Sequence, residues 1–181
     1  MAMKIAAVVN PLILCLVVSA EPVRVGTFEV DATPPLGSPL AYDLMTGVDS
    51  PLSCRGIVLL GAGDPIVLAA IDWIGLSNDG HLEFRKALAE GASTRMERVA
   101  MHALHQHDAP RCDFSAEALL AEHGMGGKKF NVAHARKVIA SVAVAVRKAV
   151  ETAEPVSHLG IGTGEVQMVA SNRRILGPDG K

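Results

Sequence analysis

Apolar residues are distributed along this chain in two ways, as short continuous runs and as longer amphipathic stretches. The segments 23–30, 56–60, 65–71 and 98–104 have the length and composition of β-strands. Residues 61–64, Gly-Ala-Gly-Asp, separate the second segment from the third, which predicts a hairpin with a glycine-bearing loop. Because 56–60 and 65–71 are apolar at consecutive positions, we expect both faces of the sheet to be covered.

Apolar residues spaced by three and four positions predict three helices, over 77–89, 115–123 and 132–154. Asn131 is the expected N-cap of the third and longest helix. After it, 156–168 is expected to form a strand pair or one bent strand.

The alternation of strands and helices predicts an α/β layered domain with a mixed sheet flanked by helices, in which 98–104 is the central strand. A length of 181 residues suits one domain with a real core. Residues 177–180, Gly-Pro-Asp-Gly, are a turn signal that ordinarily introduces another strand. We therefore expect the fold to be incomplete at the C-terminus and the chain to come from a longer precursor.

The first twenty residues have the features of a secretion signal. Lys4 gives a positive start, 5–18 is an apolar run broken by Asn10 and Pro11, and 18–20 supplies small residues for cleavage. The run is short for a bilayer span. We therefore expect residues 1–20 to be a cleaved signal peptide, residues 21–181 to be secreted or periplasmic, and no transmembrane span to remain after cleavage.

Two cysteines, Cys54 and Cys112, would remain in an oxidising compartment after cleavage. A disulfide between them would contribute roughly 3–4 kcal/mol through loop closure. Two buried free thiols fit the sequence equally well, so both alternatives stay open.

Composition narrows the class of partner. Hydrophobic residues make up 49% and charged residues 20% of the chain, which excludes a disordered polymer. The net charge is −2 without a basic block, and aromatic residues make up 3%. Neither nucleic acid nor an anionic membrane surface is an expected partner.

The strongest candidate for chemistry is the histidine stretch at 101–110, where an apolar run meets polar residues and a proline. In an extended strand His105 and His107 project from the same side, and neutral imidazole is the commonest metal-binding side chain. Catalytic residues in α/β folds gather at the carboxyl ends of strands. A metal centre needs three or four ligands, so the pair is at most part of one. The alternative is two surface histidines that leave a strand by chance.

Other polar residues have a structural reading beside a functional one. Asp72 and Asp108 would either orient a catalytic group or cap a turn. Arg173 and Arg174 would either serve a site or form a solvated pair. Lys128 and Lys129, in a glycine-containing stretch, are expected to lie in a solvated loop.

Five segments, taken in order, resemble the neutral/alkaline (non-lysosomal) ceramidases, and more closely the bacterial ceramidase-like proteins grouped with the N-terminal catalytic domain of that family. The segments are 25–35, 50–60, 70–76, the histidine stretch and Asn172-Arg173. Members of the family typically read His-Thr-His-Ser, then a small residue and proline. This chain keeps both histidines and has Gln106 and Asp108 in place of threonine and serine.

The resemblance implies a zinc hydrolase that cleaves the amide bond of ceramide, a lipid-like substrate, into sphingosine and a fatty acid. It implies that His105 binds zinc and that His107 and Arg173 act on the substrate. In the family a second His, a Glu, a Tyr and a serine of the site come from later segments. We therefore expect the fragment alone to be inactive.

Two alternatives belong to other classes. A metallo-β-lactamase-like enzyme is excluded, because its motif needs Asp-His where this chain has Ala109-Pro110. A non-catalytic exported α/β domain, either a degenerate relative or a fragment without a complete metal site, remains as the second reading.

Overall fold

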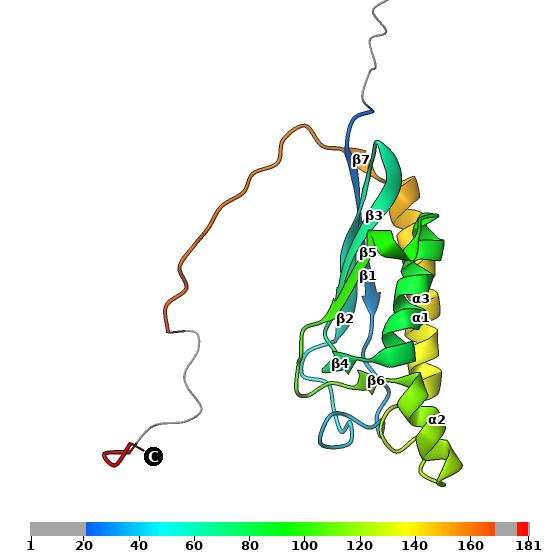
Figure 1. Ribbon diagram of the computed structural model, residues 1–181, viewed down its shortest axis with the longest axis vertical. Coiled ribbons are helices and arrows are strands. Elements are labelled where there is room, and N and C mark those ends of the chain that lie inside the picture. The colour runs from blue at the N-terminus through cyan, green and yellow to red at the C-terminus, as the bar shows by residue number, and fades with distance from the viewer. Residues whose placement is uncertain (1–20, 169–176, 181) are drawn as a thin grey trace, which may run out of the picture.

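A computed structural model of the chain describes residues 21–168 and 177–180, so the predicted signal peptide lies outside the described residues. The fold is a mixed five-stranded sheet with three helices, which confirms the predicted α/β class (Figure 1). The elements, in chain order, are β1 (Arg24–Asp31), β2 (Ser53–Gly61), β3 (Gly63–Ile71), β4 (Gly75–Leu76), α1 (Asn78–Ala92), the 3₁₀ helix η1 (Met96–Arg98), β5 (Val99–Ala103), β6 (Arg111–Cys112), α2 (Phe114–Glu122), α3 (Val132–Glu151) and β7 (Glu154–Pro155).

The sheet has the strand order β5-β3-β2-β1-β7. Strands β1, β2 and β3 pair antiparallel, with the predicted hairpin between β2 and β3. Strand β5 pairs parallel with β3 after the crossover through α1. A second, two-stranded sheet joins β4 and β6 in parallel.

Strand β5 is an edge strand, so the prediction that it is central is wrong. Its only partner among the described strands is β3, because the β1–β2–β3 meander extends the sheet in the opposite direction. Its side chains also alternate in burial. Val99 and Met101 are buried, whereas Ala100 and His102 are exposed. A strand that is rich in apolar residues is therefore not always buried on both faces.

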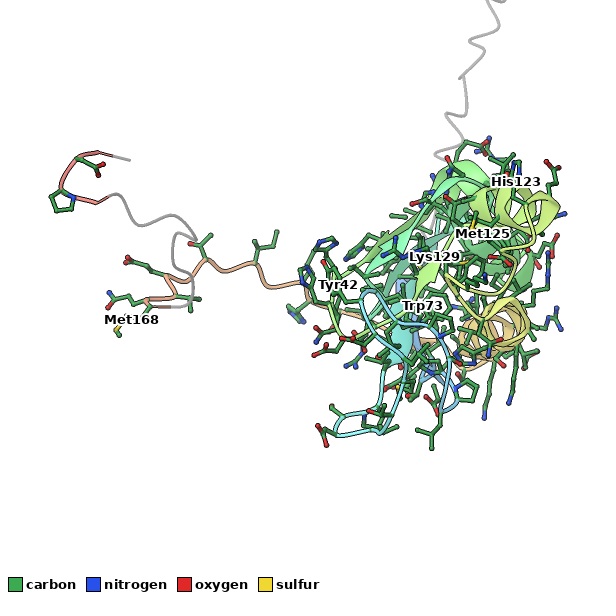
Figure 2. The ribbon with its side chains drawn as sticks, turned by 90° about the horizontal axis from the view of Figure 1, so that it is seen from below. Tyr42, Trp73, His123, Met125, Lys129 and Met168 are labelled. Carbon is green, nitrogen blue, oxygen red and sulfur yellow. The ribbon has the colours of Figure 1, made fainter. Side chains whose placement is uncertain are left out.

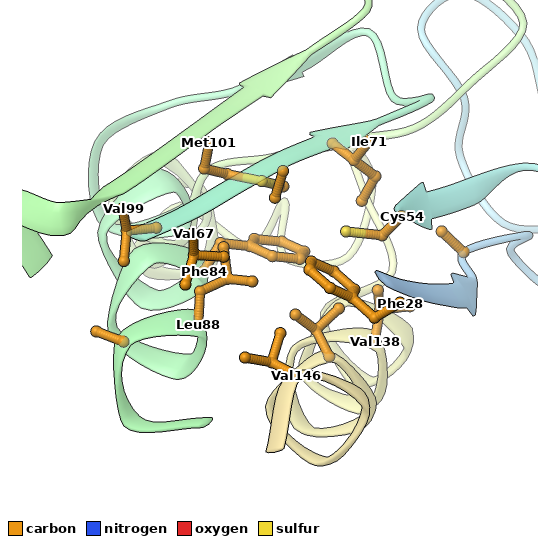
Figure 3. Close-up of a cluster of buried hydrophobic side chains, with 14 of the residues drawn as sticks. Phe28, Cys54, Val67, Ile71, Phe84, Leu88, Val99, Met101, Val138 and Val146 are labelled. Carbon is orange, nitrogen blue, oxygen red and sulfur yellow. The ribbon is translucent and has the colours of Figure 1, made fainter. Parts of the chain in front are cut away.

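Helices α1 and α3 lie together on one face of the sheet (Figure 1). Between the two layers is the hydrophobic core, whose fully buried members include Val58, Val67 and Phe84 (Figure 3). On the opposite face, Ile57 and Leu68 face away from the helices, and no described element covers them. The expectation that both faces are covered is therefore wrong for the described residues, because both long helices pack on the same side.

Glycine allows the helices to approach their neighbours closely. A Cβ added at Gly26 of β1 would overlap the carbonyl oxygen of Ala149 in α3. A Cβ added at Gly91 of α1 would lie 2.6 Å from the carbonyl oxygen of Ala143, also in α3. The position of α3 thus depends on two residues without side chains.

The helices begin where the sequence predicts but end differently. The side chain of Asn131 accepts a hydrogen bond of 3.0 Å from the His134 N–H and so caps α3. Helix α1 continues past the predicted end at residue 89 and ends at Ala92, where the C-cap Ser93 has a left-handed φ of 52°. Gly91 lies inside the helix and contacts α3.

Residues 156–168 contain no helix or strand, so the prediction of a strand pair or one bent strand is wrong (Figures 1 and 2). Strand β7 pairs with the first residues of β1, and the next contact is the Val156 N–H donating to the Val23 carbonyl at 2.8 Å. At the other end, the Gly180 N–H donates to the Gly177 carbonyl, which confirms the predicted turn.

Cys54 and Cys112 are both buried free thiols, which decides between the two alternatives in favour of thiols over a disulfide. Burial raises the pKa of each to about 12. Since the thiolate is the reactive form, both side chains are inert at neutral pH.

We expect both thiols to resist alkylation by iodoacetamide at pH 8 in the native chain, because desolvation keeps them protonated. After unfolding in guanidinium chloride both should react fully. Peptide mass spectrometry measures each site separately. Rapid native alkylation, or a Cys54–Cys112 bridge under non-reducing conditions, would contradict the structure.

Gly26→Ala should destabilise the chain by about 1–3 kcal/mol, because the added methyl group forces α3 away from β1. Gly47→Ala is the matched control, since no heavy atom lies within 4 Å of its Cβ position. Urea unfolding followed by circular dichroism measures both. Equal stability of the two variants would show that α3 does not need this close approach.

Candidate active site at the histidine pair

Trp73 fixes the backbone that carries the candidate site. Its indole is 1% exposed, packs edge-to-face on Phe84, and donates from Nε1 to the Ala32 carbonyl at 3.0 Å. This bond ties the segment after β3 to the end of β1. The Trp73 carbonyl in turn accepts the His105 N–H at 3.2 Å, so the buried ring positions the histidine loop.

Strand β5 ends at Ala103, so His105 lies in the loop that follows it and not in an extended strand. Its φ of 65° is in the left-handed region, which a residue with a side chain adopts only where its surroundings hold it. The ring supplies such a restraint, because Nδ1 lies 2.9 Å from the Ile74 carbonyl oxygen.

That contact determines the tautomer of His105. A carbonyl oxygen can only accept, so Nδ1 must carry the hydrogen and donate it to Ile74. The lone pair of the neutral ring is then on Nε2, which has no described hydrogen-bond partner. Metal-binding histidines typically hold their second nitrogen in this way.

His107 lies beside His105, with ring centroids 5.0 Å apart and planes at 76°. The two imidazoles therefore lie side by side, as predicted. The predicted reason was wrong, because the backbone at His105 is left-handed and not an extended strand. Tyr42, the only tyrosine of the sequence, packs edge-to-face on His107 at 5.5 Å. Sequence reasoning missed Tyr42, because it lies in an irregular stretch without periodicity.

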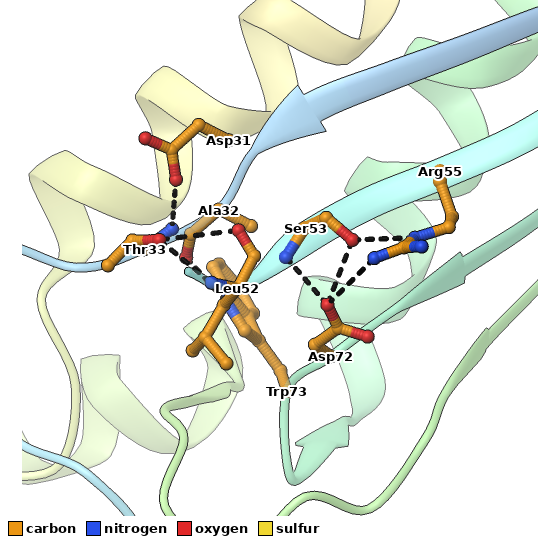
Figure 4. A network of polar contacts seen from close by, with 8 residues as sticks. All are labelled: Asp31, Ala32, Thr33, Leu52, Ser53, Arg55, Asp72 and Trp73. Atoms are coloured by element: carbon orange, nitrogen blue, oxygen red, sulfur yellow. Dashed lines mark hydrogen bonds and ion pairs between the residues drawn. The ribbon is translucent and has the colours of Figure 1, made fainter. Parts of the chain in front are cut away.

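Asp72, at the end of β3, binds residues of β2 (Figure 4). Its Oδ2 accepts from the Ser53 N–H at 2.7 Å and from the Ser53 hydroxyl at 2.8 Å, and it lies 3.7 Å from Arg55. Asp72 thus has a structural role rather than that of a partner for an imidazole.

Nearby, hydrogen bonds from Thr33 lower the pKa of the Asp31 carboxyl.

Among the described residues, the other predicted site residues form no hydrogen bond with the pair. Within the described part of the chain, Asp108 is exposed and forms no hydrogen bond with either imidazole. Arg173 lies outside the described residues. His102 is exposed on the uncovered face of the sheet.

Two hollows meet at His105. One, of about 740 Å³, lies under the loop that includes Asp43 and Asp49 and is partly lined by Asp72 and Asp108. The other, of about 440 Å³, lies between the β4–β6 pair and α2 and has mainly apolar walls. Both volumes are in the range of small-molecule sites.

The described residues fit one part of a zinc centre. His105 presents a free Nε2 of the correct tautomer, and His107 is adjacent. Between residues 21 and 168 and over 177–180, however, no three His, Cys, Asp or Glu side chains are grouped so that they could hold a metal ion. Any complete centre needs ligands from elsewhere.

Comparison with known proteins identifies the fold. No protein-family model matches the sequence, and no curated protein matches it. Among solved structures, it is similar to the neutral ceramidase from Pseudomonas aeruginosa, with a TM-score of 0.56 and 18% identity over 75% of this chain. A ceramidase complexed with C2 gives a TM-score of 0.52 and 16% identity over the same share.

This chain covers 22% of each of those two ceramidase chains. At such low identity the similarity concerns the fold alone. The described domain therefore has the fold of part of a ceramidase, and its activity is a separate question. No described helix is both long and apolar enough to cross a lipid bilayer.

The hydrogen bond to Ile74 should hold His105 in the Nδ1–H tautomer at pH 8.5, where an ordinary imidazole is neutral. Nitrogen-15 NMR of histidine-labelled chain reports which ring nitrogen carries the hydrogen. Exposed His102 is the internal control and should show the Nε2–H form that is favoured in water. An Nε2–H form at His105 would show that Nε2 is not available to a metal ion.

Proposed function

We propose that this chain forms part of a zinc-dependent hydrolase that cleaves the linear amide bond of a ceramide-like substrate, giving sphingosine and a fatty acid. Two lines support the proposal. The domain shares its fold with part of two ceramidases. The sequence also carries, in order, the segments that resemble the ceramidase family, including the His105–His107 pair.

The observation that carries the proposal is the presentation of the His105 imidazole. Its Nδ1 donates to the Ile74 carbonyl, its backbone N–H donates to the Trp73 carbonyl, and its Nε2 has no hydrogen-bond partner among the described residues. The residue lines two hollows. A histidine that only filled space would not need both a left-handed backbone and an oriented ring. We assign His105 as a zinc ligand.

The residues beside it suit amide hydrolysis. Bound zinc supplies Lewis acidity, which polarises a carbonyl and lowers the pKa of water toward ~7. His107, 5.0 Å from His105 between ring centroids, is placed to donate a hydrogen bond to the oxyanion that forms at the carbonyl oxygen. Arg173 is assigned as fixed positive charge for the same oxyanion, on the resemblance alone.

The remaining zinc ligands are proposed to come from polypeptide that is not in this sequence. The described residues contain no group of three possible metal ligands, so we expect the fragment alone to be inactive. We further propose that the mature chain is secreted or periplasmic, in keeping with the predicted signal peptide at residues 1–20.

The second candidate is a non-catalytic exported α/β domain. The lack of a three-ligand group among the described residues favours it. The two candidates differ in metal content once the polypeptide is extended by its downstream sequence. A hydrolase would hold close to one zinc per chain, and a degenerate domain would hold none.

In such an extended chain, His105→Asn should remove zinc and amidase activity together, because the amide side chain lacks the imidazole Nε2. Asparagine is preferred to alanine here, since it tolerates the left-handed φ of 65°. Zinc is measured by plasma mass spectrometry and hydrolysis with an N-acylsphingosine. His102→Asn is the control. Retention of both zinc and activity in His105→Asn would disprove the assigned role.

A further inference from the structure

The face of the sheet opposite α1 and α3, which we call the bare face, is mainly apolar at one end and polar at the other. Two rows of paired residues across β1, β2 and β3 make the apolar end, namely Val25, Leu59 and Ile66, and then Thr27, Ile57 and Leu68. The next row toward the histidine loop contains Glu29, Arg55 and His102. An apolar patch with a polar border is typical of a surface that another polypeptide segment covers.

Residues 157–168, which we call the exit segment, carry a matching pattern. Leu159 and Ile161 are 87% and 91% exposed. Glycines at 160, 162 and 164 alternate with larger residues, so an extended backbone would present glycine on one side and side chains on the other. No heavy atom lies within 4 Å of the Cβ position of any of these glycines, so no described contact requires them. The exit segment is thus a strand-like stretch whose apolar side is exposed.

The exit segment begins beside the apolar end of the bare face. The Val156 N–H donates to the Val23 carbonyl, next to the pairing of β7 with β1. From there the segment leaves on the side of the sheet opposite to α1 and α3 (Figure 1). Neighbouring strands lie about 4.8 Å apart, and an extended residue spans about 3.3 Å. Leu159 can therefore reach over β2, and Ile161 over β3, without any change in the strands.

We propose that the exit segment folds back onto the bare face of its own sheet. Leu159 and Ile161 then pack on the apolar rows of β2 and β3, and the glycines face solvent. The driving force is the removal of apolar surface from water on both the segment and the sheet. The inference concerns how the chain covers its own sheet, and it depends neither on zinc nor on hydrolase activity.

A second copy of the chain is the competing occupant of the bare face. The exit segment is joined to the sheet through Val156, which is hydrogen-bonded to Val23. A short flexible connection of this kind gives an effective concentration in about the millimolar range. A second copy at micromolar concentration would have to displace the segment, so the chain's own segment is favoured.

NMR of the methyl-labelled 181-residue chain tests the contact directly. We expect nuclear Overhauser effects between the methyl groups of Leu159 or Ile161 and those of the apolar rows of β2 and β3. A sample mixed from labelled and unlabelled chain separates contacts within one chain from contacts between copies.

A pair of variants tests the exit segment. Ile161→Ser should abolish the contacts between the segment and the sheet, because it removes an apolar side chain from the docked side. Gly162→Ser is the matched control and should keep them, since residue 162 would face solvent. Circular dichroism establishes that each variant is folded.

A second pair tests the sheet and leaves the exit segment unchanged. Thermolysin cleaves before leucine and isoleucine, so its rate of cleavage at Leu159 and Ile161 reports how often the segment is undocked. Leu68→Ser should raise that rate about tenfold, as expected when the burial of one leucine side chain is lost. Leu119→Ser, at a position in α2 that is 62% exposed, should not change it.

The proposal is overturned if the contacts are absent, if they occur only between copies, or if Ile161→Ser and Gly162→Ser lose them equally. Equal thermolysin rates in Leu68→Ser and Leu119→Ser would also overturn it.

Discussion

The burial of one indole determines where the candidate site lies. Trp73 follows directly on β3, and its ring is held by the Ala32 carbonyl and by Phe84. With the ring fixed, the carbonyls of Trp73 and Ile74 become two rigid acceptors at the end of the sheet, and His105 bonds to both of them. Packing in the core therefore fixes two backbone carbonyls, and these carbonyls orient the exposed imidazole of His105.

The helix layer explains why this end of the sheet is left open. Glycines at 26 and 91 let α3 lie directly on β1 and α1, so that both long helices cover the same face. Helix α2 then extends beyond the sheet and, with the β4–β6 pair, encloses the apolar hollow that reaches His105. Helix α2, the β4–β6 pair and the histidine loop thus lie together at one end of the domain.

The sequence pattern predicted the four long strands and the three helices, but not the short strands β4, β6 and β7 or the packing of the elements. The β2–β3 hairpin and the cap at Asn131 were predictable, because each depends on residues close in sequence. The edge position of β5 was not, since it depends on which strands pair across the sheet, and these pairings join residues that are far apart in the sequence. The histidine pair was found from its spacing, whereas the contact of Tyr42 with His107 depends on an irregular stretch and leaves no local signal.

The bare face of the sheet has a practical consequence for handling the protein. Ile57, Leu59, Ile66 and Leu68 lie on it at cross-strand positions, where Leu68 is exposed and the other three are half-buried. Two copies that met through this face would remove apolar area from solvent, and mass action would favour that encounter as the chain is concentrated. The oligomeric state of the purified domain should therefore depend on dilution.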